Sequence, residues 1–298
     1  MRPQGIFPAL VTPFNADETV SLNAVRENIR LYNQTKVAGF VVLGSTGESV
    51  MLSRDEADSI LSSVKEAAAP DKILIAGTGA ESTAETIART KRAAALGYQF
   101  ALVKTPYYYK PVYRAETYLR HYRAVADASP IPVLLYSVPQ FTGVTLETPE
   151  ILALAAHSNI VGIKDSSGNI QRVGEIVAGA PPEFTVLTGG AAVIYPALAI
   201  GGSGAILALA AALPEKCAEL FELAQNGRHD EARKLQHLLV RASKLIVSEN
   251  GIPGVKFAME LRGFHGGFAR LPLLPVSEEK KQSIATFVTQ LSPAAARV

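Results

Sequence analysis

The sequence predicts an α/β fold, a single (β/α)8 barrel followed by additional C-terminal helices. Eight short runs of residues are apolar throughout, which is typical of strands that are covered on both faces in a parallel sheet. Amphipathic segments with a helical pattern separate these runs, as expected for a barrel. The chain has 298 residues, and barrels of this type often exceed ~250 residues as one unit. We therefore expect one structural unit, with residues 1–225 forming the barrel and residues 226–298 a helical extension packed on it.

The predicted strands share short length and an uninterrupted apolar character. They are residues 6–11, 39–43, 73–76, 100–103, 132–135, 160–163, 185–187 and 204–207. An open doubly wound sheet is the competing architecture. That fold would need a glycine-rich dinucleotide loop after its first strand, and Thr12-Pro13-Phe14-Asn15 does not supply one.

Helix starts between the strands carry recognisable capping signals. Ser53 with Glu56, and Ser82 with Glu85, have the capping-box spacing in which each side chain satisfies a free backbone N–H group. Thr148 followed by Pro149 predicts a cap at Thr148 and a proline at the first helical position. After the last strand only helical patterns remain. They cover residues 215–225, 230–247, 255–261 and 277–290.

Composition excludes several classes of protein. The net charge of +2 gives no electrostatic basis for a nucleic-acid partner. The single cysteine, Cys217, excludes a disulfide within the chain and favours a reducing compartment, so we expect a cytoplasmic protein with Cys217 in the core. The N-terminus lacks the apolar core of a signal peptide.

Residues 184–214 carry no charge and are long enough to span a bilayer, but glycines at 189–190 and 201–204 divide them. We interpret this segment as two buried strands flanking a buried helix.

Barrel enzymes place their active-site groups at the C-terminal ends of the strands. In this sequence those ends carry a hydroxyl-rich glycine loop, a lysine, several phenols and no histidine. They are Gly44-Ser45-Thr46-Gly47-Glu48, Lys104 to Tyr109, Tyr136-Ser137-Val138-Pro139 and Lys164-Asp165-Ser166. The five histidines lie away from the strand ends without metal-ligand spacing, so we expect no metal site.

Lys164 is the sharpest single signal. It follows an apolar strand that would carry its amine into the mouth of the barrel. Low dielectric there disfavours the ammonium form and favours a neutral, nucleophilic amine. Lys104 has the same placement at a strand end, so periodicity does not choose between the two lysines. A surface lysine that happens to end a strand is the other interpretation of either residue.

Three further features fit a small-molecule site. The loop at residues 44–47 offers hydroxyls and backbone N–H groups as a cradle for a carboxylate, although it is equally compatible with an ordinary turn. Tyr136 could relay protons, or it could simply be a half-buried strand-end tyrosine. The run Tyr107-Tyr108-Tyr109 indicates an aromatic patch at an interface or a pocket rim.

Four co-linear motifs resemble the dihydrodipicolinate synthase / N-acetylneuraminate lyase family, and the similarity extends over nearly the whole chain. These motifs are Gly44 to Ser49, Thr105 to Tyr108, Tyr136 to Pro139 and Gly162 to Ser166. The resemblance implies that Lys164 forms a Schiff base with pyruvate and that Tyr136 relays protons. It implies catalytic roles for Thr46 and for Tyr108, which would reach a neighbouring subunit. It also implies a substrate site lined by Ser45, Thr46, Gly47, Ser166, Gly189 and Ile206. No metal or organic cofactor is implied, and the expected assembly is a homotetramer built as a dimer of dimers.

One position separates this chain from the best-known member of the family. Dihydrodipicolinate synthase has an arginine two residues after the proline of its Tyr-x-Val-Pro motif, where it grips the carboxylate of the second substrate. Here Phe141 stands at that position, and a phenyl ring cannot make bidentate bonds. The motifs look closer to 4-hydroxy-2-oxoglutarate aldolase, or a related 2-keto-3-deoxy-acid aldolase, which would release pyruvate and an aldehyde. Dihydrodipicolinate synthase and N-acetylneuraminate lyase are the alternatives within the family; a metal-dependent aldolase and a catalytically silent binding barrel are alternatives outside it.

Overall fold

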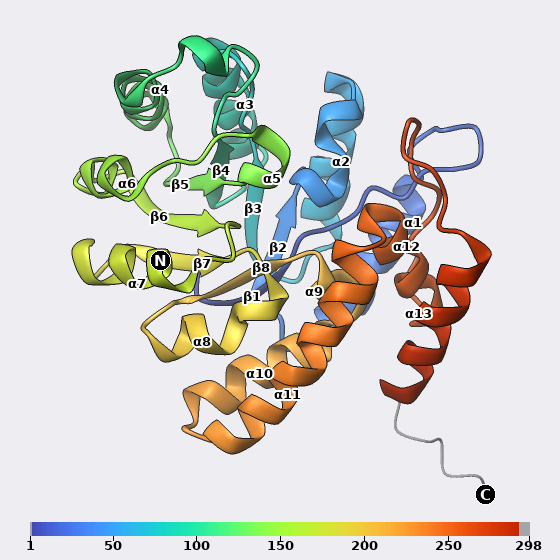
Figure 1. Cartoon of the computed structure of the whole chain (residues 1–298). Coiled ribbons are helices and arrows are strands. Elements are labelled where there is room, and N and C mark those ends of the chain that lie inside the picture. The colour runs from blue at the N-terminus through green and yellow to red at the C-terminus, as the bar shows by residue number, and fades with distance from the viewer. Residues whose placement is uncertain (1, 292–298) are drawn as a thin grey trace, which may run out of the picture.

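The computed structural model describes residues 2–291, so residues 292–298 of the predicted extension lie outside the described residues. Eight parallel strands form the predicted barrel (Figure 1). They are β1 (Gly5–Pro8), β2 (Gly39–Val42), β3 (Ile73–Gly77), β4 (Phe100–Lys104), β5 (Val133–Ser137), β6 (Ile160–Asp165), β7 (Thr185–Thr188) and β8 (Gly204–Leu207). Each predicted apolar run contains a strand, although β1 ends at Pro8 and not at residue 11 as predicted. The strands β4, β5 and β6 run further than predicted and include Lys104, Tyr136 and Lys164 themselves.

The barrel closes between its first two strands. The strand β1 pairs with β8 in parallel. Toward β2, the backbone N–H of Ala38 donates to the carbonyl of Ile6 at 2.8 Å, and that of Leu10 donates to the carbonyl of Val41 at 2.9 Å. Closure removes the free sheet edges that an open sheet would leave.

The interior of the barrel is a packed core. Alternate residues of the strands point inward and form one buried cluster, as the period of two along a strand requires. This cluster contains Phe7, Ala9, Val41, Ile75, Phe100, Leu102, Leu134, Tyr136, Val138, Leu187 and Ile206. Tyr136 therefore carries a phenol hydroxyl into this cluster.

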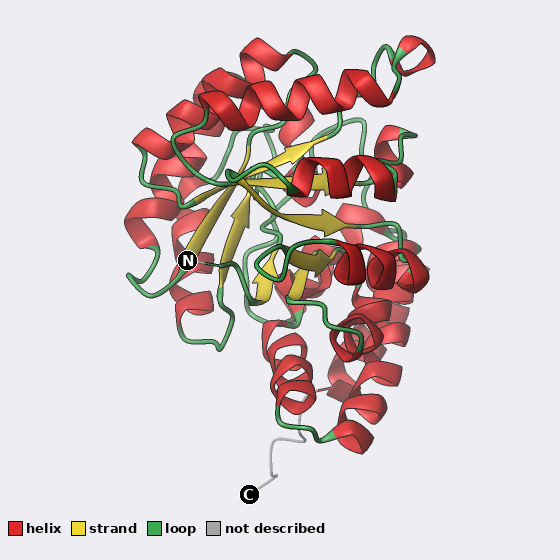
Figure 2. Ribbon diagram, turned by 90° about the vertical axis from the view of Figure 1, so that its left-hand side faces the viewer, coloured by secondary structure: helices red, strands yellow, loops and turns green. Residues whose placement is uncertain are grey.

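Helices surround the strands, and a further group of helices lies below them in Figure 2. Those up to the eighth strand are α1 (Leu22–Asn33), α2 (Arg54–Ala67), α3 (Thr83–Ala95), α4 (Ala115–Ala128), α5 (Pro139–Thr142), α6 (Thr148–Ala155), α7 (Ile170–Gly179) and α8 (Ile194–Ala199). The Ser53–Glu56 capping box is confirmed in both directions, and Ser82 accepts from the backbone N–H of Glu85. The predicted cap at Thr148 is wrong by one residue. Glu147 has the extended backbone of a cap and Thr148 is already helical, so Pro149 follows as the second helical residue.

The C-terminal helices pack on one another and on the barrel. They are α9 (Leu209–Ala212), α10 (Pro214–Gln225), α11 (His229–Ala242), α12 (Gly251–Leu261) and α13 (Glu278–Leu291). The helix predicted over residues 230–247 instead changes after α11 into a π-helical stretch, Ser243–Ser248. The helix α12 contacts both α9 and α13, and so connects α13 to the helix that follows the last strand.

The uncharged segment 184–214 forms β7, α8, β8 and α9 in succession. The two strands are buried as predicted, whereas α8 buries only Ile194 and Ala197 and is half-buried. None of the helices within residues 2–291 is long and apolar enough to cross a membrane. Cys217 is fully buried in α10, and this burial raises the pKa of its thiol. The cysteine therefore belongs to the core, as predicted.

Candidate active site

Three polar side chains face the same end of the barrel interior. In the sheet register, Lys104 pairs with Tyr136, and Tyr136 pairs with Lys164. Phe100 and Leu102 belong to the interior cluster, so alternation along β4 directs Lys104 inward as well. The phenol of Tyr136 thus stands between two lysines at the C-terminal ends of adjacent strands.

The Lys164 side chain is buried against Tyr136. Only 5% of Lys164 is exposed, and its Nζ lies 4.2 Å from the centroid of the Tyr136 ring. The next residue, Asp165, faces the opposite side of the strand, where its Oδ2 accepts from Nε of Arg172 at 2.9 Å. This partner for Asp165 fixes the end of β6, and strand alternation then directs Lys164 into the barrel.

The phenol of Tyr136 connects the strands to the glycine loop. Its hydroxyl lies 3.4 Å from Oγ of Ser45. The loop itself is a short 3-10 turn, Ser45–Gly47, between two non-glycine residues with left-handed backbones, Leu43 (φ 60°) and Glu48 (φ 54°). Such conformations cost of order 1–3 kcal/mol each and cluster at functional sites.

The loop is fixed in a shape suited to holding an anion. The N–H groups of Gly47 and Glu48 bond within the loop to the carbonyls of Gly44 and Ser45, each at 3.1 Å. Thr12, in the segment that follows β1, donates its hydroxyl to the carbonyl of Gly47 at 2.7 Å. The donors available to a ligand are therefore the hydroxyls of Ser45 and Thr46 and their own backbone N–H groups.

A cavity of about 290 Å³ opens above this arrangement. Its walls combine the glycine loop, the ends of three strands and two segments from the C-terminal part. The lining residues are Leu43, Gly44, Ser45, Glu48, Ser49, Val50, Met51, Gly77, Gly79, Leu102, Lys104, Tyr107, Tyr136, Val138, Phe141, Thr142, Ile252 and Leu273. Lys164 is not in this lining, but its amine lies against the ring of Tyr136, which is.

Two residues that follow β6 and β7 lie against each other. A Cβ added to Gly189 would lie 1.8 Å from Oγ of Ser166, so these two residues touch and only glycine fits. The N–H of Gly189 donates to the carbonyl of Asp165 at 2.7 Å. Ile206 is fully buried in the interior cluster that contains Tyr136. The structure thus brings Ser166 and Gly189 into contact and places Ile206 in the same core as Tyr136.

The comparisons with known proteins identify the family. The dihydrodipicolinate synthetase family matches residues 2–291. The chain belongs to this family. It is 36% identical over 293 residues to 4-hydroxy-tetrahydrodipicolinate synthase of Methanothrix thermoacetophila, covering 97% of each chain. It is 38% identical over 285 residues to a probable mitochondrial 4-hydroxy-2-oxoglutarate aldolase of Emericella nidulans, covering 94% of this chain and 92% of the relative.

Solved structures agree with this assignment. A dihydrodipicolinate synthase from Bacillus anthracis superposes with a TM-score of 0.92 at 30% identity, covering 98% of this chain and 100% of the other. A synthase from Acinetobacter baumannii, solved with pyruvate, gives a TM-score of 0.91 at 30% identity, covering 96% and 98%. The resemblance predicted from the motifs is confirmed, and the protein is a lyase of the dihydrodipicolinate synthetase family.

Phe141 occupies the rim of the cavity. It belongs to the short helix α5, lines the cavity and is 65% exposed. Of the described residues that line this cavity, two are charged, Glu48 and Lys104, and neither is an arginine. None of these lining residues therefore places a guanidinium group beside the ring of Phe141.

Tyr108 lies on the surface of this single chain. It is 72% exposed and packs edge-on against Tyr109 at 5.0 Å between ring centroids. The backbone of its loop is held by Glu81, whose Oε2 accepts from the N–H groups of Tyr107 and Tyr108 at 2.9 Å each. Burial raises the pKa of Glu81, but the two amides and Lys104 outweigh this effect and hold the pKa below its usual value.

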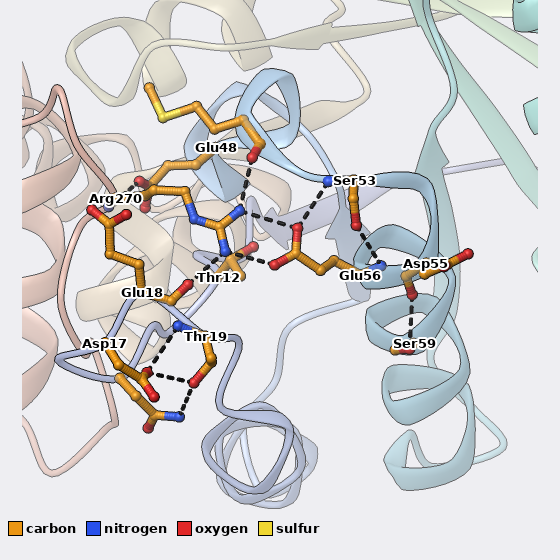
Figure 3. A network of polar contacts seen from close by, with 12 residues as sticks. Thr12, Asp17, Glu18, Thr19, Glu48, Ser53, Asp55, Glu56, Ser59 and Arg270 are labelled. Atoms are coloured by element: carbon orange, nitrogen blue, oxygen red, sulfur yellow. Dashed lines mark hydrogen bonds and ion pairs between the residues drawn. The ribbon is translucent and has the colours of Figure 1, made fainter.

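The sequence did not reveal what holds the glycine loop in place. Glu48, which is 1% exposed, accepts from the backbone N–H of Arg270 at 2.9 Å (Figure 3). Its Oε1 also lies 2.6 Å from Nζ of Lys256 in α12. Lys256 donates in addition to the carbonyl of Thr12 at 2.7 Å. Burial lowers the pKa of Lys256, and the Glu48 carboxylate opposes this shift. The only sequence signal was Glu48 itself within the Gly-Ser-Thr-Gly-Glu motif.

Arg270 ties the same region to the start of α2. Its guanidinium donates to both carboxylate oxygens of Glu56, at 2.6 and 3.1 Å (Figure 3). These hydrogen bonds from Arg270 lower the pKa of Glu56 to about 2. Glu56 also closes the capping box with Ser53. One arginine from the C-terminal segment thus links the glycine loop and the first turn of α2.

Metal ligands are not gathered in the part of the chain that the structure describes. No group of three or more histidine, cysteine, aspartate or glutamate side chains there could hold a metal ion.

Proposed function

We propose that this enzyme is a Schiff-base aldolase that cleaves 4-hydroxy-2-oxoglutarate, or a related 2-keto-3-deoxy acid, into pyruvate and an aldehyde. The observation that carries the proposal is the buried Lys164 amine 4.2 Å from the Tyr136 ring, with the Tyr136 hydroxyl 3.4 Å from Ser45. A nucleophile, a proton carrier and a carboxylate cradle are thereby gathered at one end of the barrel. Membership of the family and the pyruvate complex of the Acinetobacter baumannii relative support the same reading.

The chemistry follows from these residues. In its neutral form the Lys164 amine attacks the keto carbon of the substrate to give a carbinolamine. Tyr136 donates its phenol proton to the departing hydroxyl, so that water leaves, a protonated imine forms and Tyr136 is left as a phenolate. Tyr136 removes the proton of the C4 hydroxyl, the C3–C4 bond breaks, and its electron pair moves into the imine to leave an enamine and the aldehyde. Protonation at C3 and hydrolysis then release pyruvate and restore the amine. The imine is the electron sink, so these steps need no metal or organic cofactor.

The remaining site residues have supporting roles in this proposal. Ser45 and Thr46 hold the carboxylate next to the keto group, and Gly47 shapes the turn that presents them, which positions the keto carbon at Lys164. Ser166, Gly189 and Ile206 line the pyruvate end of the site. Phe141 faces the aldehyde end, and Tyr108 contributes its phenol to the site of a second subunit.

Borohydride trapping tests the proposal directly. Incubation with pyruvate and sodium borohydride is expected to add a reduced pyruvyl group to the protein, and peptide mass spectrometry is expected to map it to Lys164. A Lys164→Met variant is the matched control and should stay unmodified. An adduct on Lys104, or no adduct on the wild-type protein, would contradict the proposal.

Dihydrodipicolinate synthase activity is the second candidate, and it is favoured by the similarity to several 4-hydroxy-tetrahydrodipicolinate synthases. That reaction condenses pyruvate with aspartate semialdehyde, whose carboxylate would be held by the bidentate hydrogen bonds of an arginine. The phenyl ring of Phe141 argues against tight binding of this substrate. A panel of 2-keto acids assayed for pyruvate release, beside aspartate semialdehyde assayed for condensation, ranks the two candidates.

We also infer a homotetramer, arranged as a dimer of dimers, in the cytoplasm. Tyr108, Tyr109 and Val112 expose 72%, 63% and 73% of their surface on one loop, which suits burial against a second copy. One structural relative at TM-score 0.91 is described as a monomeric synthase variant, so assembly varies within the family. The buried thiol of Cys217 is compatible with a reducing compartment. Light scattering coupled to size-exclusion chromatography measures the assembly.

A further inference from the structure

Lys104 is a second inward-facing lysine that the proposed mechanism leaves without a role. It pairs in register with Tyr136, it lines the cavity, and 15% of its side chain is exposed. The other charged residue in the described lining, Glu48, is already matched by Lys256 at 2.6 Å. Lys104 is therefore the cation that this cavity presents to a substrate.

The surroundings of Lys104 hold it at the cavity wall. A Cβ added to Gly79 would lie 2.6 Å from the backbone N of Lys104 and 2.8 Å from its Cγ, so the close approach of these residues requires glycine. The Nζ lies 4.8 Å from the centroid of the Tyr107 ring. These contacts fix the stem of the side chain and leave the ammonium group near the opening.

The ammonium group of Lys104 can donate more hydrogen bonds than the one it makes to Glu81. Its Nζ donates to Oε1 of Glu81 at 3.3 Å, a long contact, while Oε2 of Glu81 is shared by two backbone N–H groups. An ammonium group has three donors. At least one further acceptor can be bound, and a carboxylate gives the strongest bond because both groups are charged.

We infer that Lys104 binds a second carboxylate, the one carried by the aldehyde half of the substrate. It would thereby select dicarboxylic 2-keto acids over those whose distal group is uncharged. This inference rests on the proposed aldolase function. The ring of Phe141, which also lines the cavity, has no hydrogen-bond donor. Lys104 at the end of β4 is therefore the residue that binds this carboxylate. A point charge on a lysine accepts a small acid such as glyoxylate without the fixed geometry that a guanidinium demands. Within the two substrate classes proposed above, this favours 4-hydroxy-2-oxoglutarate over the neutral polyol chain of a 2-keto-3-deoxy sugar acid.

A pair of substrates that differ only in the distal group tests the inference. One is 4-hydroxy-2-oxoglutarate and the other is 4-hydroxy-2-oxopentanoate, in which a methyl group replaces the distal carboxylate. Pyruvate release gives kcat/KM for both with the wild-type protein, Lys104→Met and Lys104→Arg. Lys91→Met is the control, because Lys91 is an exposed lysine of α3 outside the cavity lining.

Loss of a charge-assisted hydrogen bond should lower kcat/KM of Lys104→Met for the dicarboxylate about 10- to 100-fold. We expect the value for the methyl analogue to stay close to that of the wild-type protein, Lys104→Arg to restore part of the preference, and Lys91→Met to change neither substrate. An equal loss of kcat/KM for both substrates would overturn the inference. It would show that Lys104 acts only through Glu81, by fixing the loop that carries Tyr107 and Tyr108. Unchanged values for both would overturn it as well.

Trapping separates this inference from the proposed function. If pyruvate and borohydride label Lys164 in both the wild-type protein and Lys104→Met, the Schiff base stands, and the substrate ratio alone decides the role of Lys104. If the wild-type protein is not labelled, the proposed function fails and the inference fails with it. Circular dichroism of each variant verifies that the barrel remains folded.

Discussion

The Nζ of Lys256 lies 2.6 Å from Oε1 of Glu48, and both side chains are almost fully buried. Lys256 belongs to the C-terminal helix α12, whereas Glu48 ends the glycine loop that carries Ser45 and Thr46. A pair of this kind is costly to break, because the surviving charge is left buried without a partner. The C-terminal part of the chain therefore takes part in shaping the proposed carboxylate cradle.

Replacing Lys256 by methionine should destabilise the protein and loosen that cradle. We expect the free energy of unfolding in urea to fall by about 3–5 kcal/mol, and KM for the 2-keto acid to rise more than kcat falls. The double variant Glu48→Gln/Lys256→Met should regain part of the stability, because no charge is then left unpaired. Lys280→Met is the control, since the exposed Lys280–Glu249 pair should contribute only about 0–1 kcal/mol. A Lys256→Met protein with wild-type KM would show that the pair does not position the loop.

Removing the phenol of Tyr136 should slow proton transfer with little effect on binding. Tyr136→Phe keeps the ring beside Lys164, so we expect kcat to fall about 10²- to 10⁴-fold while KM changes little. Tyr98→Phe is the matched control, because it also removes a buried phenol, one that bonds only to the carbonyl of Leu61. A Tyr136→Phe enzyme with unchanged kcat would assign proton transfer to another group.

Phe141 is expected to limit condensation with aspartate semialdehyde. Because the side chain is 65% exposed, Phe141→Arg should fold normally and gain a guanidinium at the cavity rim. We expect the rate of condensation to rise relative to pyruvate release from 4-hydroxy-2-oxoglutarate; Phe141→Leu is the control without charge. Synthase turnover of the wild-type protein already within the usual range of about 1–10³ s⁻¹ would contradict this assignment.

The Arg270–Glu56 contact predicts a specific loss of stability in acid. The pKa of Glu56 is about 2, below its ordinary value of 4.5. Between pH 4.5 and pH 2 this carboxylate binds more protons in the unfolded chain than in the folded protein. The contribution of the contact to the free energy of unfolding is therefore complete above pH 4.5 and is lost as the pH falls toward 2. Unfolding free energies of wild type and Glu56→Gln should therefore differ most at neutral pH and converge in acid. A difference that stays constant with pH would show that the pKa of Glu56 is the same in the folded and the unfolded protein.

Cys217 should be inert until the protein unfolds. The thiol is fully buried and its pKa is raised by that burial, so little thiolate is present at neutral pH. We expect no reaction with a thiol reagent in buffer and one equivalent per chain in denaturant. Rapid labelling of the native protein would place the thiol in a region that opens easily.

Much of this protein could be predicted from local patterns. Each strand of the barrel is covered on both faces, so it must be apolar throughout, and this property is visible in eight separate runs. The position of Lys164 directly after such a run predicted its place at the end of a strand but left a surface lysine open, and the structure buries the side chain against Tyr136. Helix caps were also predicted, except that Glu147 rather than Thr148 caps α6, a shift of one residue that depends on backbone angles alone.

Contacts between distant segments were decided only by the tertiary structure. Lys104 and Lys164 look alike in the sequence, and the sheet register is what places them on either side of Tyr136, with Lys164 buried on its ring and Lys104 at the cavity. The partners of Glu48 could not be predicted, because Lys256 and Arg270 reach it only after α12 has docked on the barrel. The periodicity of apolar residues predicts which face of a helix or strand is buried. Which ion pairs form depends on how these faces pack against one another in the folded protein.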